Sequence, residues 1–271
     1  MTGLQLRLDR IFQKKSGRSV IIALSNAMYF GPVAGMTNNE EVRKVTQGAV
    51  EGKCDAVMVT PGGLRANLDV LTGRGGPAIV LSAGYTATWR AADRFGGGGF
   101  AQRMCPIASV EEALRLGADA YHLYTFLGWK DANRDAEELA LLGKICEEAR
   151  RCQLPVICEP LARGDAVDPK DCNSVENVAL MARVAAEVGA DVVKVEYTGT
   201  PDGFATVVQA SSVPVVMMGG AKTDTFDEFL TFLGGAMSSG ARGVAVGRNV
   251  YMQPDPANAI ARTVAIVHQQ K

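Results

Sequence analysis

The sequence predicts an α/β protein that folds as a single (β/α)8 TIM barrel, and three observations support this prediction. Eight short apolar segments are spread along the 271 residues. Amphipathic segments of helical length separate most of them, for example 38–53, 135–153 and 174–190. Apolar runs that alternate with such helices are typical of parallel strands covered on both faces.

The third observation is a repeated junction, in which a helix end is followed by glycine, a small residue and then an apolar run. It occurs in ALRLGADAYHL, AAEVGADVVKV and MSSGARGVAV. Glycine at such a junction supplies the left-handed cap that ends a helix. The eight strands are then, in order, SVIIALS (19–25), DAVMVTP (55–61), PAIVLSA (77–83), AYHLYTF (120–126), PVICEPL (155–161), DVVKVEY (191–197), VPVVMMG (213–219) and GVAVGRN (243–249).

The alternative fold is a doubly wound open sheet. No G-x-G-x-x-G follows the first strand, and GGGG at 96–99 stands before FAQRM, where it makes no dinucleotide fingerprint. We expect GRGGP (73–77) and RFGGGGF (94–100) to form loops at or near strand ends, where barrel enzymes carry functional groups. No domain boundary is apparent, so residues 1–271 are predicted to form one domain.

Composition argues against several classes of function. The chain has 28 Lys and Arg residues against 29 Asp and Glu residues, a net charge of −1. This balance gives no electrostatic reason to expect nucleic acid or an anionic membrane surface as a partner. No run approaches the roughly 20 apolar residues that span a bilayer. The first 19 residues also lack the apolar core of a secretory signal.

The cysteines and histidines show no metal-ligand spacing, and no motif indicates a cofactor. No C-x-x-C pair occurs among the six cysteines, and the two histidines are His122 and His268. We interpret the cysteines as reduced thiols in the core of a cytoplasmic protein.

Lys194 interrupts the predicted strand 191–197, DVVKVEY. Side chains alternate along a strand, so if Lys194 points into the barrel, Val192 and Glu196 do too, while Val193 and Val195 face the helices. Apolar surroundings should lower the pKa of a lysine toward neutrality. A neutral amine can attack a carbonyl carbon and form a Schiff base. The competing interpretation is a structural ion pair of Lys194 with Glu196 or Glu159.

Two glycine motifs downstream predict a phosphate site. Gly219 and Gly220 end the seventh predicted strand, and Gly247 and Arg248 end the eighth. Barrels frequently bind phosphate there with backbone N–H groups, and an arginine adds a charged contact. The sequence therefore predicts a phosphorylated carbonyl compound as substrate, held with its carbon near Lys194.

Three motifs carry a resemblance to a known family: K-x-x-Y-T-G at 194–199, Gly-Gly at 219–220 and G-R-N at 247–249. Nearly the whole chain resembles the class I aldolase superfamily of archaeal-type fructose-bisphosphate aldolases, aminodideoxyheptulosonate synthases and the autoinducer-2 phosphate thiolase. The resemblance implies a homo-oligomeric TIM barrel, commonly in pentamer-based rings, and a Schiff-base lysine at Lys194. It also implies phosphate binding by Gly219, Gly220, Gly247 and Arg248.

The chain departs from this family at two proton-transfer positions. Where the family reads A-x-D-H-G after the first strand, this chain has ALSNA, which puts Ser25 and Asn26 at the Asp and His positions. Where aldolase-type members read Y-P-R-G, this chain reads LARG, so Leu161 replaces the tyrosine and Arg163 is retained. We therefore expect a different reaction from standard fructose-bisphosphate cleavage, with Ser25, Asn26 and Arg163 as candidate substrate-binding residues.

Four residues are candidates to replace the missing groups. Glu159 lies two residues before Leu161 and shares its predicted inward face, and Glu196 shares that of Lys194. Burial should raise the pKa of such carboxyls, which suits acid–base work. His122 and Tyr124 share one face of another strand and could donate to a substrate oxygen. Ion pairs for the carboxylates and a structural role for His122 are the alternatives.

Three functions are consistent with these residues. The first is a Schiff-base lyase or synthase that makes or breaks a carbon–carbon bond in a phosphorylated ketone or aldehyde, with Glu159 as the preferred proton-transfer group. The second is a thiolase-type transferase acting on a phosphorylated dione, which the shared start RLDRIF…SGR…GP and the missing tyrosine favour. The third is a catalytically silent barrel that binds a phosphorylated ligand.

Overall fold

The computed structural model describes residues 2–86 and 103–269, and at its centre is a closed barrel of eight parallel strands. Around the barrel the order is β1-β10-β9-β8-β7-β6-β3-β2. Each strand overlaps one of the predicted apolar segments, so the predicted TIM barrel is confirmed. The strands are β1 (Ser19–Ala23), β2 (Ala56–Val59), β3 (Ala78–Ser82), β6 (Ala120–Leu127), β7 (Val156–Ala162), β8 (Val192–Val195), β9 (Val215–Met218) and β10 (Gly243–Val246).

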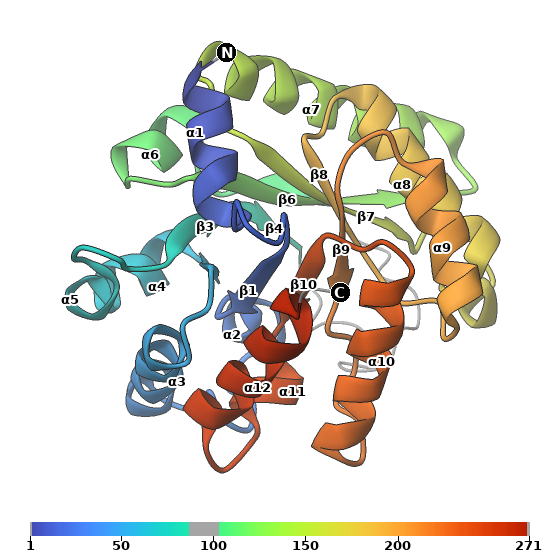
Figure 1. Ribbon diagram of the computed structural model, residues 1–271. Coiled ribbons are helices and arrows are strands. Elements are labelled where there is room, and N and C mark those ends of the chain that lie inside the picture. Colours follow the sequence, from blue (N-terminus) through green and yellow to red (C-terminus); the bar gives the residue numbers. More distant parts are fainter. Residues whose placement is uncertain (1, 87–102, 270–271) are drawn as a thin grey trace.

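Helices surround the barrel (Figure 1). The last helix packs beside α3, which brings the two ends of the ring of helices together. The helices are α1 (Thr2–Ile11), α2 (Asn26–Phe30), α3 (Asn39–Glu51), α4 (Pro61–Ala66), α5 (Leu68–Leu71), α6 (Val110–Arg115), α7 (Ala132–Arg151), the 3-10 turn η2 (Pro169–Asp171), α8 (Val175–Val188), α9 (Pro201–Ala210), α10 (Phe226–Ser238), α11 (Arg248–Tyr251) and α12 (Pro256–His268).

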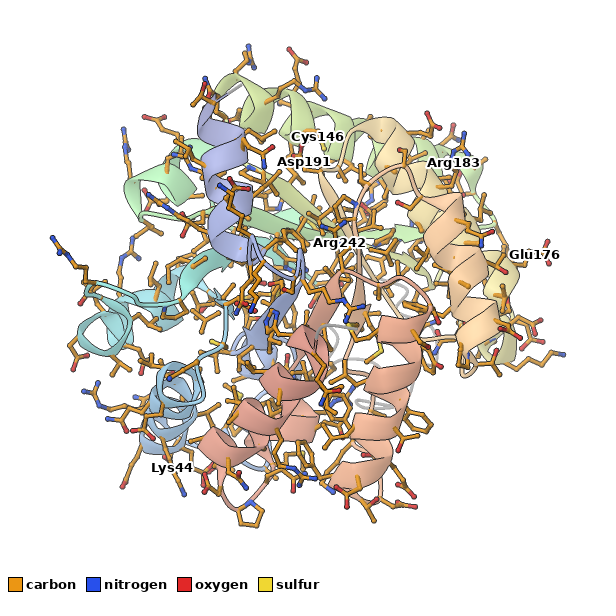
Figure 2. All side chains as sticks on the ribbon, in the orientation of Figure 1. Lys44, Cys146, Glu176, Arg183, Asp191 and Arg242 are labelled. Carbon is orange, nitrogen blue, oxygen red and sulfur yellow. The ribbon has the colours of Figure 1, made fainter. Side chains whose placement is uncertain are left out.

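The strands alternate between two apolar layers, as predicted. Val192 belongs to the cluster inside the barrel, whereas Val193 and Val195 belong to the larger cluster between strands and helices. The helices show the complementary pattern. On α8, the buried residues face the barrel, while Glu176 and Arg183 extend outward (Figure 2). The β8 register that places Lys194 inside the barrel is thus set by its valine neighbours.

Helix α1 closes the amino-terminal end of the barrel. Ile11 is fully buried in the interior cluster, and Leu8 and Phe12 pack against that cluster. Arg10 bonds to Asp119 at 2.9 Å, and Asp119 directly precedes β6. With this end filled by side chains, the carboxyl ends of the strands are left to form the functional site.

Two predictions about loops have different outcomes. Gly117 and Gly240 have φ of 75° and 96°, which confirms the left-handed junction before β6 and β10. The segment 73–77 forms a loop at a strand end, as predicted. It joins α5 to the amino end of β3, however, so the predicted place of this segment among the functional loops is wrong. The segment 94–100 lies outside the described residues.

Two local features had no counterpart in the prediction. Helix α2 follows β1 directly, and a short antiparallel pair forms from β4 (Gly84–Tyr85) and β5 (Cys105–Pro106). Both lie at the carboxyl ends of the strands that precede them. Among residues 2–86 and 103–269, no helix is long and apolar enough to cross a membrane.

Candidate active site

A cavity of about 520 Å³ opens among the carboxyl ends of the strands. Most of the predicted site residues line it, although they come from nine different elements or loops. Those that line it are Asn26, Tyr124, Glu159, Arg163, Lys194, Glu196, Gly219, Gly220, Gly247 and Arg248. Ser25 and His122 are buried and do not line the cavity.

Lys194 forms a buried ion pair with Glu159. Its Nζ donates to Oε2 of Glu159, and only 8% and 7% of the two side chains are exposed. The β7–β8 register pairs Cys158 with Val193, so the next pair of residues brings the two side chains to one level. Of the two ion pairs considered from the sequence, the structure contains the one between Lys194 and Glu159. It also places a proton acceptor directly on the amine.

His122 reaches the site through Glu159. Its Nε2 lies 3.1 Å from Oε2 of Glu159, and its Nδ1 lies 3.2 Å from Oγ of Ser82. Burial lowers the pKa of His122, and this outweighs the opposing effect of the Glu159 carboxylate, so the ring is neutral at neutral pH. His122 thus holds Glu159 from behind rather than facing the cavity.

The pKa of Glu159 differs from the predicted direction. Burial by itself raises the pKa of this carboxyl, but the charge of Lys194 and the hydrogen bond from His122 together lower it below its ordinary value. The predicted increase is therefore wrong for the unliganded protein, because the sequence did not show that both partners meet at one oxygen. Glu159 is an ionised carboxylate and is suited to accept a proton.

Glu196 is paired with the other predicted cation. Its Oε2 accepts from Nη2 of Arg163 at 2.7 Å, and the same nitrogen donates to Oδ1 of Asn173 at 2.9 Å. Burial raises the pKa of Glu196 in spite of Arg163, as predicted. The two carboxylates thus differ, with Glu159 held ionised on Lys194 and Glu196 closer to protonation on Arg163.

The two glycine motifs form adjoining loops at the mouth of the cavity. Gly220 has a φ of 65°, and its carbonyl accepts from Nη2 of Arg248 at 2.9 Å. Gly219 has a different task, because its N–H donates to Ala245 and a side chain there would approach Val246 within 2.7 Å. Its N–H is therefore not offered to an anion, and Gly220, Gly247 and Arg248 remain the candidates for the predicted phosphate site.

Asn249 and Asn26 support these loops. Nδ2 of Asn249 donates to the carbonyls of Gly219 and Ala221 at 2.7 and 2.9 Å, which ties the β9 loop to α11. Asn249 was part of the G-R-N motif but was not predicted to have this role. Nδ2 of Asn26 donates to the hydroxyl of Tyr251 at 2.9 Å.

Tyr29 is a further cavity residue that the sequence reasoning missed. It lies on α2, is 2% exposed, and its hydroxyl bonds to Ser82 at 2.9 Å and to the carbonyl of Gly84 at 2.6 Å. Its ring packs edge-on against Tyr124 with 5.1 Å between centroids. No periodic pattern marks a tyrosine in a five-residue helix, so only the fold reveals it.

The lowered pKa of Glu159 predicts a pH effect on stability. Above the ordinary value of 4.5, the carboxylate is ionised in both states and its pair with Lys194 contributes fully. As pH falls through the lowered pKa, the unfolded chain takes up the proton first and this contribution is lost. We expect Glu159→Gln to make the free energy of unfolding less dependent on pH below about pH 5, measured by urea unfolding.

Glu196→Gln is the control of opposite sign. Its raised pKa contributes stability below 4.5 that is lost as pH rises through the folded pKa. Glu196→Gln should therefore change the dependence of the unfolding free energy on pH at a higher pH than Glu159→Gln does. Identical curves for the two variants would contradict the assignment of charges.

The fold and the position of Lys194 define a class of protein, the class I aldolases. The chain belongs to the DeoC/LacD family aldolases, whose family profile matches residues 20–253. It is 31% identical over 269 residues to an uncharacterized aldolase of Saccharolobus solfataricus, covering 99% of this chain and 96% of the relative. It is 30% identical over 267 residues to the 2-amino-3,7-dideoxy-D-threo-hept-6-ulosonate synthase of Halobacterium salinarum, covering 98% and 92%.

The fold is also similar to that of a solved aldolase structure. An archaeal fructose-1,6-bisphosphate aldolase, with its catalytic lysine covalently bound to the carbinolamine intermediate of the substrate, superimposes with a TM-score of 0.83. The two chains are 28% identical, and the match covers 98% of this chain and 100% of the other. This protein is thus an aldolase-type enzyme by family, and one of these similar proteins is named for a bisphosphate substrate.

Proposed function

We propose that this protein is a Schiff-base lyase or synthase that makes or breaks a carbon–carbon bond in a phosphorylated ketone or aldehyde. The observation that supports this most directly is the buried contact of Lys194 with Glu159 in a cavity whose mouth carries the two glycine loops. One ligand in this cavity could then contact the amine, the proton acceptor and the candidate phosphate site together. The covalent lysine of the archaeal aldolase supports the same role for Lys194.

The chemistry follows from this arrangement. Lys194 transfers a proton to Glu159, and the free amine attacks the carbonyl carbon to give a carbinolamine. Glu159 gives this proton to the hydroxyl of the carbinolamine, which leaves as water and produces an iminium. The positive nitrogen of the iminium then takes up the electrons of the neighbouring carbon–carbon bond when that bond breaks. The product is an enamine on Lys194, and protonation of its carbon allows hydrolysis. Glu159, which lies beside Lys194, can supply the proton to this carbon.

Leu161 separates this enzyme from a standard fructose-bisphosphate aldolase. The side chain lines the cavity at the position of the family's tyrosine and cannot transfer a proton. Ser25, at the position of the family's aspartate, is buried outside the lining. A substrate whose reaction needs the family's tyrosine and aspartate would find neither group in this cavity. We therefore propose an acceptor that differs from the triose phosphate of sugar cleavage.

The alternatives are less well supported. The named relatives are aldolases and synthases, which does not favour a thiolase that transfers onto a thiol. A silent barrel would have no use for a lysine whose burial is costly. A homo-oligomer, implied by the family resemblance, stays a prediction.

Borohydride reduction tests the proposed function. Incubation with dihydroxyacetone phosphate, a phosphorylated ketone, followed by borohydride should add the mass of the reduced adduct to the peptide that contains Lys194. An adduct on another lysine, or none with any ketone phosphate, would overturn the proposal.

Arg248 provides a separate test of the phosphate site. We expect Arg248→Ala to raise KM by about 10- to 100-fold with little change in kcat, because a charged hydrogen bond to phosphate acts equally in ground and transition states. Arg262→Ala is the control, since Arg262 pairs with Asp227 on the surface. An equal effect on a substrate without phosphate would contradict the assignment.

A further inference from the structure

A chain of buried hydrogen bonds leads away from Lys194 and returns to the cavity. It begins where Lys194 and His122 meet at Oε2 of Glu159, and continues from Nδ1 of His122 to Oγ of Ser82 at 3.2 Å. His122 and Ser82 are fully buried, and they are direct partners in the β3–β6 register. These residues join the amine to a polar path through the barrel wall.

The second half of the path ends at a cavity residue. Oγ of Ser82 lies 2.9 Å from the hydroxyl of Tyr29. The ring of Tyr124 packs edge-on against that of Tyr29 with 5.1 Å between centroids, which makes the Tyr124 hydroxyl the next polar group of the path. Tyr124 lines the same cavity as Lys194 and is the register partner of Glu159. Tyr124, Glu159 and Lys194 therefore stand at one level on three neighbouring strands.

The direction of the chain is set by charge. Glu159 is ionised, so Nε2 of the neutral His122 must carry the ring proton and Nδ1 must accept. Ser82 then donates to His122, and Tyr29 can donate to Ser82 or to the carbonyl of Gly84. Each group from Tyr124 to Glu159 can thus donate to the next.

We propose that this chain is a proton relay that connects the oxygen of the acceptor, at Tyr124, with the carboxylate beside Lys194. The relay consists of Tyr124, Tyr29, Ser82, His122 and Glu159. This inference rests on the proposed function. It gives Tyr124 the proton-transfer task that Leu161 cannot perform, and it makes Tyr29, Ser82 and His122 positioning residues.

In the direction of cleavage, the hydroxyl of the substrate gives its proton to Tyr124 while its O–H electrons form the new C=O bond. Each relay group passes on its own proton, and the last one arrives on Glu159. The electrons of the broken carbon–carbon bond enter the enamine and neutralise the iminium nitrogen.

Loss of that charge favours the transfer. Burial raises the pKa of Glu159, and the charge of Lys194 is the largest of the contributions that lower it. When the nitrogen of Lys194 becomes part of a neutral enamine, its attraction for the Glu159 carboxylate disappears. Burial then raises the pKa of Glu159 without this opposing effect. Glu159 therefore becomes a better base in the step in which a proton reaches it.

Two reactions of one substrate separate the relay from Schiff-base formation. Exchange of the C3 hydrogens of dihydroxyacetone phosphate in D₂O needs Lys194 and Glu159, whereas condensation of this ketone with propanal also needs a proton on the acceptor oxygen. We expect Tyr124→Phe and Ser82→Ala to slow condensation by about 10²-fold or more, the effect of a lost general acid, and to leave exchange and the borohydride adduct intact.

Two matched controls lie outside the relay. Tyr121→Phe removes a buried tyrosine hydroxyl from the same strand, one that bonds to Ala108 on the helix side, and Ser19→Ala removes a buried serine hydroxyl from β1. Both should condense like the wild type. The relay is overturned if either Ser82→Ala or Tyr124→Phe condenses at the wild-type rate, or if exchange falls in parallel with condensation.

A substrate-free measurement adds a second test. The relay requires the Nε2–H tautomer of His122, which ¹⁵N NMR of the ring nitrogens distinguishes from the Nδ1–H tautomer. Finding the Nδ1–H form at neutral pH would overturn the relay even if the enzyme forms its adduct. Failure of the wild type to form any adduct would instead count against the proposed function.

Discussion

Lys194→Ala should eliminate the borohydride adduct and lower turnover by on the order of 10⁴- to 10⁶-fold, the scale of effect expected when a covalent nucleophile is removed. The reason is specific to the cavity, because Lys194 is the lysine that contacts Glu159 there, in the described part of the chain. Turnover is measured with the substrate that gives the wild-type adduct, and the adduct by mass spectrometry.

The alanine variant also leaves Glu159 buried without its partner, which is a stability cost. Lys194→Arg is therefore the matched variant. It keeps a positive charge beside Glu159, but a guanidinium stays protonated and cannot form an imine. Both variants should fail to form the adduct, whereas only the alanine variant should lose stability through the unpaired carboxylate. Turnover near the wild-type rate in either one would end the Schiff-base proposal.

Glu159→Gln should lower kcat by about 10²- to 10⁴-fold, the range for a lost general base. The amide can keep contacts with Lys194 and His122 but cannot accept the proton that the amine must lose before it attacks. Unlike Ser82→Ala, this variant should slow hydrogen exchange and condensation together. Rapid kinetics of adduct formation with dihydroxyacetone phosphate would locate the loss at the first step.

Glu196→Gln separates this role from a general effect of charge. Glu196 lines the same cavity but bonds to Arg163 instead of Lys194. We expect adduct formation by this variant to remain close to that of the wild type. If Glu196→Gln lost adduct formation and Glu159→Gln kept it, the two carboxylates would exchange roles.

Much of the barrel could be predicted because its signals are local. A run of apolar residues fixes a strand, and the valines around Lys194 fix which face it takes. The same alternation placed Glu159 inside and Leu161 in the cavity wall. Fold and inward-facing residues follow from period and burial alone.

Contacts between strands could not be predicted in this way. The meeting of Lys194 and His122 at one oxygen depends on the registers of three strands, and it reversed the predicted direction of the Glu159 pKa. Tyr29 reaches the site from a helix of five residues, too short to show a period. Asn249 acts by bonding to carbonyls of another loop, which no spacing within its own motif reveals.

The plug formed by α1 has a consequence for the order of events in turnover. The amino-terminal end is filled by Ile11 and its neighbours, and the cavity of the described residues opens at the carboxyl ends of the strands. Lys194 lies deep behind this opening, 7% exposed. For the proposed reaction, we expect the ketone to enter before its reaction partner and to leave after it. Excess aldehyde would occupy the passage ahead of the ketone, so inhibition by the second substrate should be competitive with the first.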